Sequence, residues 1–435
     1  MTEEKRGVPL VPRKAVFPFI LITSLFALWG FANAVTDPMV SAFKKVLELN
    51  NFQASLVQLS FYGGYFTLAL PAAYFMRKYS YKSGVLIGLA LYATGALLFY
   101  PAAAFENYAF FLIAIYILTF GLAFLETSAN PYILSMGDER TATRRLNLAQ
   151  AFNPLGLMGG LFVAQTFILS RLQSDDIHNY SDLTEPIKQS IRTADLRVIR
   201  NPYIFLGVFV VVIFLIIKFV KMPRTKEKGP LPEMSAIVSR LLKQKRFTSG
   251  VVTQLFYVGA QIMCWTYIYH YAENLNISNE TAVNYAYVAF ALFLSGRFIF
   301  TYLLKFTTPG NLLFILTIFA VAFSAGTIFL QSVFGLYCLV GISFCMSLMF
   351  PTIFGIALEG LGEDAKVASA FMVMAIVGGA IMPVLQGLLI DVGGRALDDH
   401  DILGVPEVNF SFILPLICFL VVGCYGFCFR KPLIQ

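Results

Sequence analysis

The chain has 435 residues, of which 58% are hydrophobic and only 13% are charged, and its mean hydropathy is +0.72. Soluble domains carry about 25% charged residues, so this composition excludes an ordinary soluble protein and predicts an integral membrane protein. The net charge of +7 does not indicate nucleic-acid binding, because the Lys and Arg residues gather at the edges of apolar segments, where they set membrane topology.

Apolar segments long enough to cross a bilayer recur along the whole chain. A crossing helix needs about 20 mainly apolar residues, and this measure predicts roughly twelve spans. An all-helical membrane fold is expected, because barrel strands would alternate in polarity at every second residue. The expected spans are 16–40, 53–76, 83–104, 107–136, 146–170, 200–221, 247–273, 281–305, 310–330, 333–360, 366–391 and 408–430.

Basic residues mark alternate loops: the N-terminus and the loops after the second, fourth and sixth spans. The other loops carry few, apart from Lys44, Lys45 and the segment 171–199. The positive-inside rule therefore predicts that both termini lie in the cytoplasm. The most basic loop divides the chain into three expected parts, an N-terminal six-helix half, a cytoplasmic linker and a C-terminal six-helix half: 1–221, 222–246 and 247–435.

Two further patterns accompany this division. In the linker, PEMSAIVSRLLKQKR has apolar residues at helical spacing, which predicts either a short helix at the cytoplasmic interface or a solvated linker. A weak repeat relates NPYILSMGDERTATRRLNLAQAFNPLGLMGG to FPTIFGIALEGLGEDAKVASAFMVMAIVGG, each a proline-bearing helix, a Gly-acid turn and a small-residue helix. Parallel halves are typical of transporters that bind substrate near mid-membrane.

Two carboxylates lie inside expected spans: Asp37 in FALWGFANAVTDPMV and Glu126 in ILTFGLAFLETSANPYI. A charge at the bilayer centre costs about 2.5–3.5 kcal/mol on insertion scales, so such acids normally line an aqueous path or carry protons. The alternative is an ion pair, but the other cation deep in a span is Arg297, in the other half, where a structural role is expected. Because burial disfavours the charged carboxylate, either acid can bind a proton and release it when the cavity rehydrates.

Amide and aromatic residues accompany these acids. Amides donate and accept hydrogen bonds, which matches the hydroxyls of a sugar, and Trp or Tyr rings stack on its C–H faces. A single Asn or Gln can instead join two helices. Gln150 and Asn153 share one helix face, and Gln254, Tyr257 and Gln261 form one polar stripe. The predicted substrate-binding residues are Asn33, Gln58, Asn130, Gln150, Asn153, Gln254, Tyr257, Gln261 and Trp265.

Other function classes lack their sequence signals. The chain has no Gly-x-x-x-x-Gly-Lys-Ser/Thr phosphate loop, so ATP-driven transport is disfavoured. Its six cysteines fall in apolar segments without zinc-ligand spacing, and no metal or cofactor is expected. A membrane enzyme would need a nucleophile–base pair, and a sugar sensor would need a larger output domain than the linker 222–246.

Six motifs together resemble the bacterial L-fucose/proton symporters of the fucose-hexose branch of the major facilitator superfamily. They keep that family's order and spacing along nearly the whole chain: FALWGFANAVTD, NFQASLVQLSFYGGYF, LETSANPY, RLNLAQAFN, QLFYVGAQIMCW and FPTIFGIALEGLG. The resemblance implies twelve helices in two halves that import L-fucose with a proton by alternating access. It also implies that Asp37 and Glu126 are the functional pair and that Gln150 and Asn153 line the cavity.

Three positions bear on which sugar is carried. Glu126 favours fucose, because the glucose/galactose members have Gln at this place. The fucose carriers end the first motif Asn-Asn-Leu-Asn-Asp, whereas this chain reads Asn-Ala-Val-Thr-Asp up to Asp37, and Phe350 stands where a Tyr is expected. The alternatives are a glucose/galactose or other hexose symporter of the same family, or an uncoupled sugar facilitator, which would not need an ionisable Glu126. The expected protein is a multi-pass monomer of a bacterial inner membrane whose partners are sugar, proton and lipid.

Overall fold

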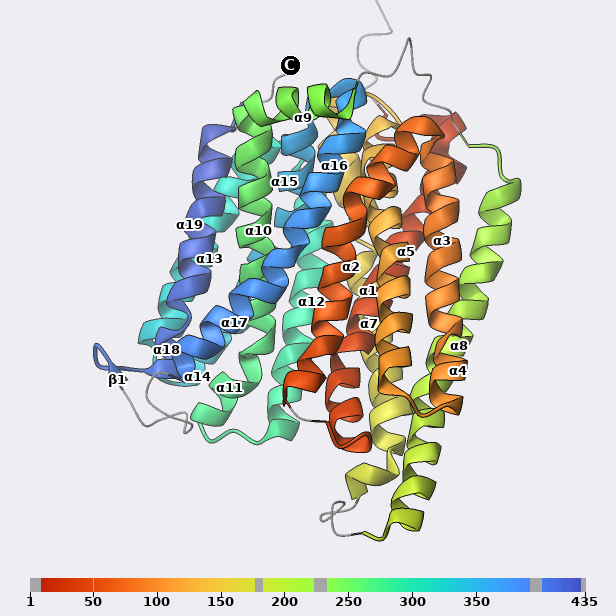
Figure 1. The fold of residues 1–435 in the computed structure, drawn as a ribbon. Coiled ribbons are helices and arrows are strands. Elements are labelled where there is room, and N and C mark those ends of the chain that lie inside the picture. The colour runs from red at the N-terminus through yellow and green to blue at the C-terminus, as the bar shows by residue number, and fades with distance from the viewer. Residues whose placement is uncertain (1–8, 50, 177–182, 223–232, 392–400, 432–435) are drawn as a thin grey trace, which may run out of the picture. The chain divides into compact units, whose positions relative to one another are not determined.

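The computed structural model describes residues 9–49, 51–176, 183–222, 233–391 and 401–431, and most of them are helical (Figure 1). The first helices are α1 (Val16–Val46), α2 (Asn51–Lys78), α3 (Tyr81–Leu97), α4 (Phe99–Ala104), α5 (Tyr108–Ser135), α6 (Ala142–Gln150), α7 (Asn153–Val163) and α8 (Glu185–Phe219). Short helical turns lie between and beside them: η1 (Arg13–Ala15), η2 (Glu139–Thr141), η3 (Ala164–Ile168), η4 (Leu169–Arg171) and η5 (Gln173–Asp176).

The chain continues with a further series of helices and one small hairpin. The helices are α9 (Met234–Lys243), α10 (Lys245–Thr266), α11 (Ile268–Asn274), α12 (Asn279–Leu303), α13 (Pro309–Phe329), α14 (Val333–Met346), α15 (Met349–Leu358), η7 (Gly362–Asp364), α16 (Ala365–Met374), η8 (Ala375–Val377), α17 (Gly378–Ile390), α18 (Glu407–Phe410) and α19 (Ile413–Cys428). The hairpin pairs β1 (Asp401–Ile402) with β2 (Val405–Pro406) in antiparallel register.

The helices confirm the expected fold class. Within the described residues, 10 helical segments are long and apolar enough to cross a membrane, and α10 and α11, bent by 42° at the break between them, also meet this measure when taken together. The remaining expected span corresponds to α2, whose 28 residues rise about 42 Å, more than a bilayer core needs. Polar residues such as Gln53 and Gln58 lower its hydropathy. The described helices thus match the twelve expected spans.

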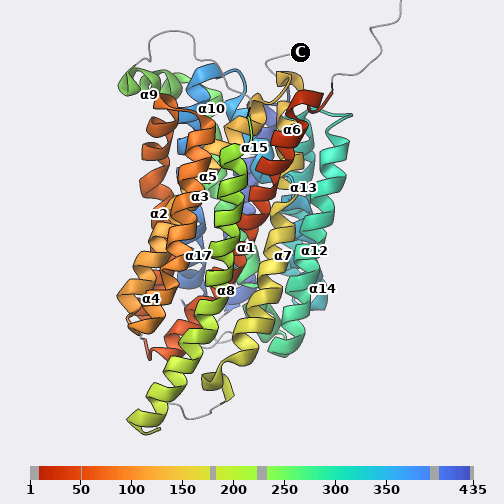
Figure 2. The ribbon, with the colours of Figure 1, turned by 90° about the vertical axis from the view of Figure 1, so that its right-hand side faces the viewer.

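The structure differs from the sequence prediction at the sixth span. The expected span begins at residue 200, but α8 begins at Glu185 and continues past the ends of α3 and α4 (Figures 1 and 2). The polar side chains of this extension bind neighbouring loops. Lys188 Nζ lies 3.0 Å from Glu48 Oε1, and buried Asp195 accepts from two backbone amides of η5 at 2.8 and 3.0 Å. Tertiary contacts therefore extend the N-terminal end of a helix that hydropathy alone would begin about fifteen residues later, at residue 200.

The chain forms two compact units. The first, here called the Glu126 unit, comprises Phe17–Tyr132 and Phe152–Lys226. The second, called the Trp265 unit, comprises Met1–Val16, Ile133–Ala151 and Glu227–Gln435. The segment Ile133–Ala151 belongs to the expected N-terminal half, yet it packs in the Trp265 unit, so the chain passes between units within the fifth span, at the break between α6 and α7.

Direct contacts between α6 and α15 account for this grouping. Asn147 Nδ2 donates to Thr352 Oγ1 at 3.1 Å, and both side chains are buried. At Gly355, an added Cβ would lie 2.6 Å from Thr143 Oγ1, so the two helices approach as closely as a glycine permits. RLNLAQA, from the first copy of the internal repeat, and FPTIFGIALEG, from the second copy, thus meet inside one unit.

Within the Glu126 unit, glycines set the distance between α1 and α7. A Cβ added at Gly156 would lie 2.6 Å from the carbonyl carbon of Ala27, and one added at Gly160 would lie 2.6 Å from Phe31 O. Gly156 and Gly160 are four residues apart on one helix face, the small-xxx-small spacing that lets membrane helices touch through their backbones. The helix that carries Asn33 is therefore held firmly against α7.

The linker contains a short helix, which is one of the two possibilities that its sequence pattern allowed. In α9, Ile237 and Leu241 are buried, as helical spacing predicts for an apolar face. On the same helix, Arg240 forms a two-pronged ion pair with Asp364 of η7, with N–O distances of 2.8 and 3.1 Å. The linker helix is thus docked within the Trp265 unit rather than being a solvated tether.

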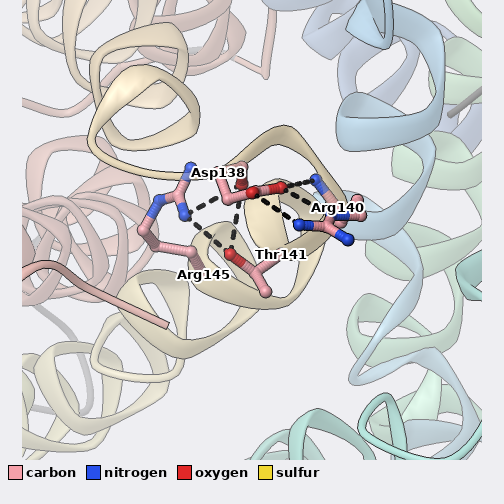
Figure 3. A network of polar contacts seen from close by, with 4 residues as sticks. All are labelled: Asp138, Arg140, Thr141 and Arg145. Carbon is pink, nitrogen blue, oxygen red and sulfur yellow. Dashed lines mark hydrogen bonds and ion pairs between the residues drawn. The ribbon is translucent and has the colours of Figure 1, made fainter. Parts of the chain in front are cut away.

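A buried guanidinium closes the hairpin between α5 and α6 (Figure 3). The last carbonyls of a helix have no partner within it, and a positive charge there is favourable. Arg145 supplies both: its Nε donates to Ile133 O at 2.7 Å and its Nη2 to Leu134 O at 2.5 Å. Gly137 leaves room for the guanidinium, because an added Cβ would lie 2.6 Å from Arg145 Nη1. Arg145 thus caps the helix that carries Glu126.

The exposed side of this hairpin is held by a second arginine (Figure 3). Asp138 accepts hydrogen bonds from the backbone and side chain of Arg140, at 2.9 Å and twice at 3.1 Å. These hydrogen bonds hold the pKa of Asp138 below its usual range. Thr141 Oγ1, at the end of η2, accepts from Arg145 Nη1 at 3.0 Å and so links the two arginines' networks.

Candidate functional site

Glu126 is buried in α5, with 9% of its surface exposed, and its neighbour in space is a tyrosine. Tyr65 of α2 donates from its hydroxyl to Glu126 Oε1 at 3.2 Å, and only 1% of Tyr65 is exposed. Among the described residues, no Lys, Arg or His forms an ion pair with Glu126. A buried carboxyl that is hydrogen-bonded to a phenol and not paired with a cation is suited to bind and release a proton.

The other acid and two of the amides lie on α1 and α2. Asp37 and Gln58 are in the helical parts of these elements, but their side chains lie outside the described residues. Asn33, one helical turn before Asp37, is half-buried, and its Oδ1 is shielded from solvent without a partner among the described residues. The structure therefore confirms that these positions are helical and leaves their predicted roles as predictions.

Two further amides of the Glu126 unit differ in their surroundings. Asn130 follows Glu126 by four residues on α5, so the two share a helix face, and Asn130 is 1% exposed. Asn153 is the first residue of α7, and its Nδ2 donates to Phe26 O of α1 at 3.2 Å. This hydrogen bond joins two helices, which is the structural role that a membrane amide can have in place of substrate binding.

Gln150 meets the intramembrane arginine. Arg297 Nη1 of α12 donates to Gln150 Oε1 at 3.4 Å, and both residues are buried. The Arg297 guanidinium also lies 4.9 Å from the Phe293 ring centre, a cation–π distance. Arg297 thus donates a hydrogen bond from α12 to the predicted cavity residue Gln150, and its expected structural role stays a prediction.

The predicted stripe on α10 is less uniform than its spacing implies. Gln254 is fully buried, and neither atom of its amide has a hydrogen-bond partner among the described residues. Tyr257 is also fully buried, and its hydroxyl donates to Met346 O at 3.0 Å. Gln261 is half-buried. Tyr257 is therefore engaged with α14, whereas the amide of Gln254 retains its full hydrogen-bonding capacity.

Trp265 ends the stripe in an aromatic cluster. Its Nε1 donates to Ser343 Oγ at 3.2 Å, and the rings of Phe290 and Phe293 meet it edge-on at 4.9 and 5.1 Å. Phe293 also carries the cation–π contact to Arg297. The indole is thus oriented by helices α12 and α14, and it is half-buried.

The predicted residues therefore divide between the units. The Glu126 unit holds Asn33, Asp37, Gln58, Glu126, Asn130 and Asn153, and the Trp265 unit holds Gln150, Gln254, Tyr257, Gln261 and Trp265. Tyr65, the hydrogen-bond partner of Glu126, is not among the residues predicted from the sequence. FYGGYF indicates that a tyrosine hydroxyl in this span needs an acceptor, but it does not show which of Tyr62 and Tyr65 meets Glu126.

The described part of the chain contains no group of three or more His, Cys, Asp or Glu residues placed to hold a metal ion.

Comparison with known proteins confirms the resemblance noted in the sequence. The chain is 53% identical to the L-fucose-proton symporter of Haemophilus influenzae over 96% of this chain and 97% of that protein. It is 30% identical to a glucose/galactose transporter of Brucella abortus over 94% and 93%.

A solved structure, that of the transporter FucP in the outward conformation, superposes with a TM-score of 0.86 and 34% identity over 96% of this chain and 100% of that one. The family model of the Major Facilitator Superfamily matches residues 19–383. The chain is a multi-pass membrane protein that belongs to the Major Facilitator Superfamily.

Proposed function

We propose that this protein is a proton-coupled symporter that imports L-fucose across the inner membrane of a bacterium, as a monomer with both termini in the cytoplasm. The similarity to the Haemophilus influenzae L-fucose-proton symporter carries the proposal, because 53% identity extends over 96% of the chain. The buried carboxyl of Glu126, which forms no ion pair within the described part of the chain, supports the coupled proton.

In the proposed cycle, a proton from outside binds Glu126, and sugar binds with help from Asp37. The loaded carrier then changes from the outward-facing to the inward-facing conformation, and the proton and the sugar are released into the cytoplasm. A ligand that binds the outward-facing and inward-facing conformations equally well does not shift the equilibrium between them. Proton and sugar together must therefore bind most tightly to the conformation through which the two interconvert. Gln254 is well suited to the sugar, because the donors and the acceptor of its buried amide have no partner among the residues that the structure describes.

The sugar is assigned on two grounds. Identity is 53% to the L-fucose relative and 30% to the glucose/galactose relative. Glu126 is also the residue expected of the fucose members. A glucose/galactose symporter and an uncoupled facilitator are the alternatives, and one experiment separates all three.

De-energised cells that contain the protein are expected to alkalinise a weakly buffered medium when L-fucose is added, because each sugar enters with a proton. The medium pH is recorded for L-fucose, D-glucose, D-galactose and L-galactose, with vector-only cells as the control. L-fucose should give the largest signal. A larger D-glucose signal would move the assignment to the glucose/galactose side, and sugar entry without any pH change would identify a facilitator.

Asp37→Asn is expected to weaken both sugar binding and uptake, because the charged carboxylate accepts stronger hydrogen bonds from hydroxyls than an amide does. The loss of a charged acceptor changes affinity roughly ten-fold or more. Binding of L-fucose to the purified variant and initial uptake rates measure the two effects separately. Unchanged affinity together with unchanged uptake would remove Asp37 from the mechanism.

A further inference from the structure

Tyr65 is the one residue of the described chain whose side chain hydrogen-bonds the Glu126 carboxyl. The two positions are 61 residues apart in sequence, on α2 and α5, and both side chains are buried. Nothing in the apolar character of FYGGYF requires a hydroxyl at this place, since Phe would fill the same volume. The contribution of the Tyr65 hydroxyl therefore lies in its hydrogen bond to the Glu126 carboxyl.

The packing around Tyr65 fixes where its hydroxyl lies. Its ring packs edge-on against Phe61 with a centroid distance of 5.7 Å. At the adjacent Gly64, an added Cβ would lie 2.8 Å from Thr119 Cβ, so α2 approaches α5 closely beside Tyr65. The reach of the phenol toward Glu126 is thus set by backbone packing and is not adjusted by a flexible chain.

The O–O distance of 3.2 Å is slightly longer than the usual O–H···O distance of about 2.5–3.0 Å. Hydrogen bonds to an ionised carboxylate are shorter and roughly twice as strong as those to a neutral group. The contact therefore has room to tighten when Glu126 loses its proton, and it stabilises the charged form more than the neutral one.

We propose that Tyr65 is a positioning residue that sets the pH at which Glu126 releases the transported proton. The inference rests on the proposed function, in which Glu126 carries that proton. The proton binds a Glu126 oxygen from the outside water, the O–H bond breaks toward the inside water, and Tyr65 keeps its own proton throughout. Without the Tyr65 hydroxyl, the Glu126 carboxyl would bind the proton too tightly and release it too slowly.

Tyr65→Phe tests this role, because it removes the hydroxyl and keeps the ring. Sugar counterflow, the exchange of internal for external L-fucose, needs loaded carrier but no net proton release. In the unmodified protein, counterflow should fall at alkaline pH as Glu126 loses its proton. In Tyr65→Phe this fall should move to higher pH by about one unit, which corresponds to a roughly ten-fold tighter proton. Net uptake should slow at the same time.

The matched control is Tyr116→Phe. Tyr116 also lies on α5, and its hydroxyl contacts Thr67 of α2 at 3.0 Å, so this variant loses a phenol bond between the same two helices without touching Glu126. Its counterflow should keep the unmodified pH dependence. A shift of equal size in Tyr116→Phe would show that helix contact, rather than the bond to Glu126, moves the profile, and would overturn the inference.

Two further measurements separate this inference from the proposed function. In a Glu126→Gln background, Tyr65→Phe should produce no additional change in counterflow; an additional pH shift would contradict action through Glu126. If Glu126→Gln still accumulates sugar, the proposed coupling fails. If it does not, but Tyr65→Phe keeps the original pH profile, the role of Tyr65 alone fails.

Infrared difference spectra of the unmodified protein avoid any dependence on how well the variant folds. A pH jump should show a protonated carboxyl C=O band that disappears in Glu126→Gln. As this band disappears on a jump to alkaline pH, the C–O band of a tyrosine should shift, because Tyr65 then donates a stronger hydrogen bond to the ionised carboxylate. Loss of the carboxyl band with no change in any tyrosine band would overturn the inference.

Discussion

Replacement of Glu126 by Gln is expected to abolish uphill accumulation of L-fucose while counterflow continues. The amide keeps the shape of the side chain and an acceptor for the Tyr65 hydroxyl, but it cannot bind and release a proton. With one proton per sugar, a pH difference of one unit sustains about ten-fold accumulation, because one pH unit and a ten-fold gradient are the same free energy. Without the proton, sugar only equilibrates.

Accumulation and counterflow of radiolabelled L-fucose in proteoliposomes measure the two properties in one preparation. Glu139→Gln is the matched control, because it makes the same chemical change at an exposed position of η2. It should accumulate sugar normally. Continued accumulation against a gradient by the Glu126 variant would exclude Glu126 as the coupling site, and loss of both activities would indicate that the variant no longer binds sugar.

Gly156→Ala is expected to destabilise the protein strongly, although it adds a single methyl group. The new Cβ would lie 2.6 Å from Ala27 C and 2.8 Å from Ala27 Cα, both backbone atoms that cannot rotate away. Overpacking of this kind costs about 1–3 kcal/mol and occasionally more. The loss should be visible as a lower Tm in detergent and a smaller fraction of monodisperse protein on size-exclusion chromatography.

Gly159→Ala, one turn along the same helix, is the control that the structure offers. A Cβ there would meet Phe31 Cδ2 at 4.0 Å, an ordinary van der Waals contact. Because Ala favours a helix over Gly by up to about 1 kcal/mol, this variant should keep or raise the Tm. Equal Tm values for the two variants would show that the close approach of α1 and α7 does not govern stability.

Much of the fold follows from hydropathy, because the bilayer imposes both the length and the apolar character of each span. The N-terminal part of α8 does not follow from it, since residues 185–199 are largely polar and are held by Glu48, 140 positions away from Lys188, and by η5. The break of the fifth span is likewise local chemistry: Pro154 at the start of α7 supplies no backbone N–H to continue α6.

The candidate site was only partly accessible from the sequence, for a similar reason. Glu126 is conspicuous because a carboxylate contrasts with its apolar neighbours. Tyr65 does not contrast with them, since tyrosines are common in this chain, and only the fold brings it to Glu126. Helical spacing placed Gln254 and Tyr257 on one face, but it could not show that the Tyr257 hydroxyl is engaged by a carbonyl.

The cap formed by Arg145 has a consequence for how the protein is made. In the proposed orientation, its charge belongs to the positive cluster that keeps the fourth loop in the cytoplasm during insertion, a step that reads charge and accepts Lys as well as Arg. Afterwards the same side chain donates from three nitrogens to carbonyls of Ile133, Leu134 and Asp138. A lysine is a point donor and cannot reproduce that fork. Position 145 therefore has two requirements. Membrane insertion needs only a positive charge, which Lys or Arg supplies, whereas the folded hairpin needs the forked donors that only Arg supplies.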